Sequence, residues 1–143
     1  MFETIVVAVD GSESSDRALD YAARLARSES SKLVLAHVTE LIAGRAAGTV
    51  DVDNDERVAA LRARAAEIKA SGVDAELQQA TSMTGGPAHA VAEIAERAGA
   101  DLIVTGTRGH TALTGVVLGS VAQRMMHVAP CPVLVVTGPH KEG

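Results

Sequence analysis

Three glycines and a serine in the last third of the chain have the types and spacing of a phosphate-binding loop. Gly106 and Gly109 are followed by Gly119 and Ser120, with nine residues between the second and third glycines. The apolar run at residues 102–105 predicts a buried strand ending at Gly106, and the apolar residues after Ser120 recur at helical spacing. A strand, a glycine loop and a helix N-terminus present backbone N–H groups and a positive dipole end to an anion. The pattern therefore favours nucleotide binding.

Two better-known phosphate motifs fit the sequence poorly. A dinucleotide fingerprint needs G-x-G-x-x-G near the first strand, whereas that turn here reads Asp10-Gly11-Ser12. A Walker loop ends in Gly-Lys-Ser/Thr, and Gly119 is followed directly by Ser120 with no lysine before it. Loop glycines often serve only tight turns. Their placement around a strand end and a helix start favours phosphate binding over that simpler explanation.

The other reactive side chains show no catalytic or metal-binding pattern. The histidines are scattered without the ligand spacing of a zinc site, and no G-x-S-x-G motif marks a serine hydrolase. Cys131 lies between two prolines at a predicted strand start, where a small buried residue is a plainer interpretation than a reactive thiol. Hydrolysis of a bound nucleotide needs a positioned water and an oriented base, and no dedicated base is evident.

The composition narrows the class of partner. The 143 residues carry a net charge of −5, and Phe2 and Tyr21 are the only aromatic residues. Nucleic acids and anionic membranes favour clustered Lys and Arg, and single-stranded nucleic acid also favours aromatic stacking, so we expect neither partner. No apolar run approaches the roughly 20 residues that span a bilayer, and no signal peptide is visible. The single cysteine fits a reducing compartment. We expect a cytoplasmic protein.

Strand and helix patterns alternate along the chain, which predicts one α/β domain covering residues 1–143. The predicted strands occupy residues 5–9, 33–38, 73–79, 102–105 and 133–136, with a helical apolar pattern in each intervening segment. Polar and apolar residues alternate in the third strand, which places it at a sheet edge. Ser12 or Ser14 can cap the first helix, and Gly72 and Gly99 can end the second and third.

The alternation indicates a doubly wound, Rossmann-like parallel sheet with helices on both faces. We expect five strands in the order 3-2-1-4-5, so that the winding reverses between the first and fourth strands. Ligands of such sheets bind at the carboxyl ends of the strands where the winding reverses. This position brings Asp10 and the Gly106 loop to one crevice, and it favours ligand binding by Asp10 over helix capping alone.

The last predicted strand is continuously apolar, although the expected order places it at an edge. Exposed apolar edges invite pairing with another chain. We therefore expect a two-fold homodimer through this strand, from Pro132 to Thr137. The alternative is a C-terminal tail that folds over the edge.

These residues resemble the ATP-binding branch of the universal stress proteins over nearly the whole chain. The glycine–serine pattern resembles the signature of that branch, and residues 5–12 and 100–106 resemble its first strand with the acidic turn and its fourth strand. Residues 119–122 and 129–136 are similar to its closing helix and strand. The resemblance implies a homodimer, one ATP per subunit, and a role in stress or dormancy signalling.

The resemblance also implies roles for individual residues in holding ATP and Mg²⁺. Asp10 is placed near the ribose or the metal-bound phosphates and is the predicted metal ligand, and Val38 is placed against the adenine. The first two glycines are placed near the ribose and phosphates, whereas the third glycine and the serine hold phosphate oxygens. Arg108 is either a solvated loop charge or a group that reaches a terminal phosphate. The full predicted site consists of Ala8, Asp10, Val38, Gly106, Thr107, Arg108, Gly109, Gly119, Ser120 and Val121.

Three functions are compatible with these residues. The first is an ATP-binding regulatory protein whose partner affinity changes with occupancy, the partner being an unknown protein. The second is a slow ATPase or a nucleotidyl-transferring enzyme on the same scaffold. The third is a dimeric adaptor without a working nucleotide site, which the intact glycine–serine pattern disfavours.

Overall fold

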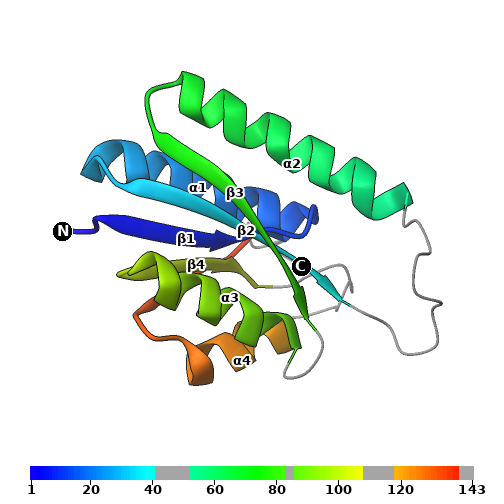
Figure 1. Ribbon diagram of the computed structural model, residues 1–143. Coiled ribbons are helices and arrows are strands. Elements are labelled where there is room, and N and C mark those ends of the chain that lie inside the picture. Colours follow the sequence, from blue (N-terminus) through cyan, green and yellow to red (C-terminus); the bar gives the residue numbers. More distant parts are fainter. Residues whose placement is uncertain (41–51, 83–85, 108–117, 139–143) are drawn as a thin grey trace, which may run out of the picture.

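The computed structural model describes residues 1–40, 52–82, 86–107 and 118–138. Strands and helices alternate along these residues (Figure 1). The elements, in chain order, are β1 (Thr4–Ala8), α1 (Glu13–Glu29), β2 (Lys32–Glu40), α2 (Val52–Ala70), β3 (Asp74–Ser82), α3 (Gly86–Ala98), β4 (Leu102–Gly106), α4 (Ser120–Val128) and β5 (Val133–Val136). All strand pairs are parallel, and the order β3-β2-β1-β4-β5 confirms the predicted sheet.

The helices cover both faces of the sheet, as predicted. Helices α1 and α2 lie on one face, and α3 and α4 lie on the other (Figure 1). Successive side chains of a strand point to opposite faces. In β1, Ile5 and Val7 accordingly pack in the core cluster beneath α1 and α2, whereas Val6 packs in the cluster beneath α3 and α4. Burial on both faces explains why the inner strands are continuously apolar.

The two strands on one side of the sheet are longer than their apolar patterns predicted. β2 and β3 pair from Lys32 with Asp74 to Glu40 with Ser82, so both extend beyond the end of β1. Backbone hydrogen bonds between neighbours extend these strands through polar residues, a tertiary effect that side-chain pattern does not report. β3 lies at the sheet edge and has exposed and half-buried positions along its length, as its alternation indicated.

The last strand, β5, lies at the opposite edge of the sheet, as predicted. β5 pairs only with β4 in the described sheet, and all of its residues are half-buried. Leu134 and Val136 pack against the core cluster beneath α1, and Val133 packs against the cluster beneath α3 and α4. No helix in the described part of the chain is long and apolar enough to cross a membrane.

A carboxylate fixes β1 beside β4 at the end of the sheet where both strands begin. Asp101 accepts hydrogen bonds from the N–H groups of Glu3 at 2.9 Å and Thr4 at 3.1 Å. Burial by itself would raise the pKa of Asp101, but these backbone donors together hold that pKa below its usual value. The two strands whose carboxyl ends form the predicted site are thereby fixed in register at their opposite ends.

Candidate functional site

The carboxyl ends of β1 and β4 lie side by side, as the predicted winding requires. Val7 pairs with Val104, and Asp10 and Thr107 follow three residues later on these adjacent strands. The structure therefore brings the acidic turn and the start of the glycine loop to the same edge of the sheet, although they are far apart in sequence. Arg108 and Gly109 lie outside the described residues.

The Asp10 carboxylate is oriented by the first turn of α1. Its Oδ1 accepts hydrogen bonds from the Ser12 N–H at 2.9 Å and the Ser12 hydroxyl at 2.6 Å. Its own N–H donates to Ser15 Oγ at 3.0 Å. The Ser12 Oγ also accepts from the Ser15 N–H at 3.2 Å, so Ser12 is the N-cap of α1, one of the two serines predicted for that role. Asp10 thus supports the cap and is held at the carboxyl end of β1.

Gly106 is required by packing against α1. A Cβ atom at this position would lie 2.7 Å from the Ser14 carbonyl oxygen and would also collide with the Ser14 hydroxyl. Ser14 is buried in the first turn of α1, so the backbone there cannot easily withdraw. From the sequence, we attribute this glycine to close contact between the backbone and a bound ligand. The structure supplies an independent reason, which is close contact between the end of β4 and the start of α1.

The N-terminus of α4 is joined to the end of β4 by a short hydrogen bond. The Gly119 N–H donates to the Thr107 carbonyl oxygen at 2.6 Å. Gly119 is the N-cap of α4 and makes no side-chain capping bond, and the first turn of this helix contains no acidic residue. Ser120 is therefore the exposed first residue of the helix rather than its N-cap. The first turn of a helix has backbone N–H groups without partners inside the helix, and these donors and the positive dipole end favour an anion.

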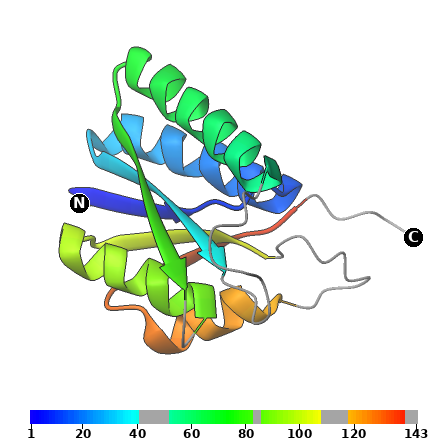
Figure 2. The ribbon, with the colours of Figure 1, turned by 45° about the vertical axis from the view of Figure 1, so that its right-hand side comes forward.

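The apolar residues of the predicted site share the face covered by α3 and α4. Ala8, Val38 and Val121 are partly buried and pack against the core cluster on that face. They come from the ends of β1 and β2 and from the first turn of α4. Figure 2 shows α3 and α4 side by side on this face of the sheet. An apolar ring bound at this edge would contact this face, beside the N-terminus of α4.

A cavity of about 440 Å³ adjoins Ser120 and Val121. It lies between the N-terminal ends of α3 and α4, and its walls also include Gly86, His89 and Arg124. From the sequence, Gly86 and His89 were missed because α3 is remote in the chain from the glycine loop, and Arg124 was missed because only the fold shows that this side chain faces a cavity. The spacing of Ser120 and Arg124, one helical turn apart, was a signal that could have identified Arg124.

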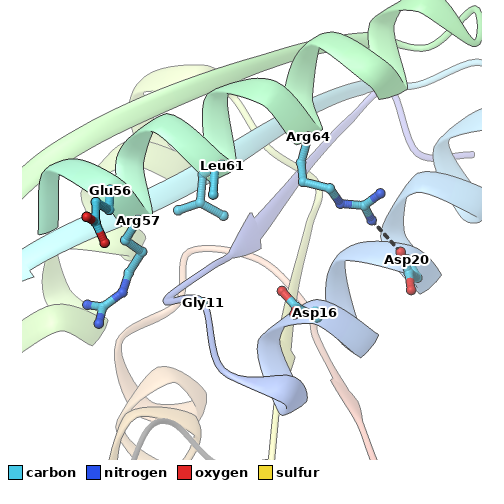
Figure 3. A pocket seen from close by; sticks show the side chains of 8 residues that line it. Gly11, Asp16, Asp20, Glu56, Arg57, Leu61 and Arg64 are labelled. Atoms are coloured by element: carbon cyan, nitrogen blue, oxygen red, sulfur yellow. Dashed lines mark hydrogen bonds and ion pairs between the residues drawn. The ribbon is translucent and has the colours of Figure 1, made fainter. Parts of the chain in front are cut away.

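A larger cavity of about 690 Å³ lies on the opposite face of the sheet, between α1 and α2. Figure 3 shows Arg57 and Arg64 extending from α2 toward α1 and the turn at Gly11. Arg64 already forms an ion pair with Asp20 at 2.5 Å. Burial raises the pKa of Asp16, which also lines this cavity. None of the predicted nucleotide-binding residues that the structure describes lines this cavity, and its mixed, partly paired charges favour no single ligand.

A buried histidine, His37, contacts the segment that follows β1 and carries Asp10. His37 is only 1% exposed, and its Nδ1 lies 3.1 Å from the carbonyl oxygen of Val9, the residue before Asp10. Its Nε2 lies 3.0 Å from Asn54 Oδ1, in the first turn of α2. His37 therefore connects β2, the end of β1 and α2. From the sequence alone, His37 is one of several scattered histidines without metal-ligand spacing. Its structural role was not predictable because its two hydrogen-bond partners are distant in the chain.

Metal ligands are sparse in the described residues. No group of three or more His, Cys, Asp or Glu side chains there is placed to hold a metal ion. Asp10 supplies a single carboxylate at the sheet edge. Mg²⁺ commonly binds through one or two carboxylates together with water and substrate phosphates, so one carboxylate fits a nucleotide-bound Mg²⁺ better than a metal held by protein alone.

Comparison with known proteins points to one family. The model of the universal stress protein family matches residues 1–137. The universal stress protein YxiE of Bacillus subtilis is 34% identical over 150 aligned residues, which cover 95% of this chain and 99% of that protein. A universal stress protein of Thermus aquaticus is 36% identical, again covering 95% and 99% of the two chains. A crystal structure of a universal stress protein in complex with cAMP superposes with a TM-score of 0.72 at 31% identity, covering 94% of this chain and 97% of that one.

Proposed function

The chain belongs to the universal stress protein family, and we propose that it is an ATP-binding regulatory protein of the cytoplasm. The observation that carries this proposal is the hydrogen bond from the Gly119 N–H to the Thr107 carbonyl. This bond holds the N-terminus of α4, which has no side-chain capping bond, beside the carboxyl end of β4, the strand next to β1. The related structure in complex with cAMP supports a nucleotide as the ligand, and ATP as that nucleotide is our proposal.

The described residues divide naturally among the parts of the nucleotide. The N-terminus of α4, at Gly119 and Ser120, would bind phosphate oxygens because its backbone donors and dipole favour negative charge. Asp10, held by Ser12, would contact the ribose or a phosphate-bound Mg²⁺, which would neutralise phosphate charge when bound. Ala8 and Val38 would pack against the adenine from the face of α3 and α4.

A regulatory role fits this site better than efficient catalysis. Hydrolysis requires an oriented water and a base that activates it. In the described part of the site, Asp10 is the one carboxylate among the predicted residues, and its Oδ1 already accepts two hydrogen bonds from Ser12. ATP would therefore act by favouring one conformation or one partner complex over another.

Calorimetric titration of the nucleotide-stripped protein with ATP and Mg²⁺ tests this proposal. We expect saturable binding near one ATP per chain, with Gly109→Ala binding at least about tenfold more weakly, a loss of about 1.4 kcal/mol. Circular dichroism of the variant serves as the control for folding. A folded wild-type protein that binds no ATP would refute the proposal, and the protein would then be better described as an adaptor.

We further propose that the protein is a homodimer joined through β5. The strand is apolar, only half-buried, and free of a second strand neighbour in the described sheet. Val135 packs in neither core cluster, so its replacement tests the edge with little effect on the core. We expect sedimentation velocity to show a dimer at micromolar concentration and a monomer for Val135→Lys, because a charged edge opposes strand pairing. A stable wild-type monomer would refute this assembly.

A further inference from the structure

The cavity between α3 and α4 continues the proposed phosphate site. Ser120 and Val121 belong both to that site and to the cavity wall. From there the cavity extends to the first turn of α3, at Gly86 and Pro87. Its volume of about 440 Å³ exceeds what one phosphate group fills, and it falls within the roughly 300–1,000 Å³ typical of small-molecule sites. A nucleotide held by its first phosphate at α4 would have this space for further phosphates.

The charges around the cavity favour an anion. Arg124 and His89 line it from α4 and α3, and both side chains are exposed. No carboxylate in the described residues lies within ion-pair distance of Arg124, whereas the Arg64 guanidinium in the other cavity pairs with Asp20. Neither α3 nor α4 has an acidic residue in its first turn. Among the described residues, the cavity therefore combines a guanidinium that has no carboxylate partner with two helix first turns that carry no acidic residue.

We propose that this cavity holds the terminal phosphates of a nucleoside triphosphate, with Arg124 as the residue that selects triphosphates over monophosphates. The inference rests on the proposed nucleotide function and names its phosphate specificity. Arg124 lies one helical turn after Ser120, so both side chains lie on the same side of α4. A guanidinium binds phosphate oxygens with charge-assisted, often bidentate hydrogen bonds, and Arg124 lines the cavity into which a phosphate chain held at Ser120 would extend.

Calorimetric titration with Mg-ATP and with AMP tests the role of Arg124. The wild-type protein is expected to bind ATP more tightly than AMP. Arg124→Gln is expected to weaken ATP binding about tenfold and to leave AMP binding within about twofold, because only the charge at the terminal phosphates is lost. Arg97→Gln is the matched control, since Arg97 is an exposed arginine in the last turn of the neighbouring helix α3, and we expect it to change neither affinity.

Tripolyphosphate, titrated as an inhibitor of ATP binding, gives a second measurement of the same cavity. It is expected to compete with ATP in the wild type and about tenfold less effectively in Arg124→Gln. Equal losses for ATP and AMP, or no loss for either, would overturn the role of Arg124 while leaving the proposed nucleotide function intact. A folded wild-type protein that binds neither nucleotide would overturn both proposals together.

Discussion

Ser120→Asp is expected to abolish ATP binding without destabilising the protein. Ser120 is the exposed first residue of α4, where the backbone donors of the helix meet the cavity. A carboxylate at this position interacts favourably with the helix dipole and would stabilise the folded state by about 0.3–1 kcal/mol. The same carboxylate would repel the phosphates and occupy their donors. We expect ATP affinity to fall at least about a hundredfold, since like charges in contact cost several kcal/mol.

Calorimetry and thermal unfolding, measured on the same samples, separate these two effects. Met126→Asp is the charge control, because Met126 lies on the same helix, is 53% exposed and does not line the cavity. We expect that variant to bind ATP within about threefold of wild type, since salt screens a distant surface charge. Ser120→Ala, which removes only the hydroxyl, should give an intermediate loss. Undiminished ATP binding by folded Ser120→Asp would place the phosphates elsewhere.

Gly106→Ala is expected to lower the free energy of unfolding by about 2–3 kcal/mol, in the upper part of the roughly 1–3 kcal/mol that forcing extra atoms into a packed region costs. The added Cβ would meet Ser14 backbone atoms at 2.7 and 2.8 Å, so the start of α1 or the end of β4 must move. Movement of α1 would also disturb the Ser12 cap that orients Asp10. We therefore expect weaker ATP binding in this variant as a consequence of the displaced helix.

Urea denaturation at equilibrium measures this loss, with Gly138→Ala as the matched control. A Cβ at Gly138 would also meet a close neighbour, at 2.8 Å, but that atom is Nη2 at the flexible end of Arg17. The arginine can rotate away, so we expect Gly138→Ala to stay within about 0.5 kcal/mol of wild type. Equal stabilities of the two variants would show that the contact between Gly106 and α1 relaxes freely.

The sequence predicted the architecture because its local and global signals agree. Four of the five strands carry an apolar run, and the third alternates polar and apolar residues. Each helix carries an apolar stripe, and parallel α/β rules leave few ways to order these elements. The boundaries were less accurate. β2 and β3 extend to Glu40 and Ser82 because they pair with each other, and pairing between strands leaves little trace in the residues of either one.

The sequence predicted those residues of the candidate site that lie next to a strand end or a helix start. The expected topology placed Asp10 and the Gly106 loop at one sheet edge, and the loop pattern placed Ser120 at the start of the following helix. The structure brings the elements that carry these residues together there. Arg124, His89 and His37 were not found. Their significance depends on neighbours from remote segments, such as the first turn of α3 and the start of α2.

The sequence by itself determined the order of the strands, the two core faces and the sheet edge at which Asp10 and the start of the glycine loop meet. These follow from residue periodicity and from the handedness of the crossovers, which are properties of short segments and their order. Only the tertiary structure decided why residue 106 must be glycine and which helices enclose the cavity beside Ser120. Such features depend on contacts a few ångströms long between segments far apart in the chain, and no local pattern specifies those distances.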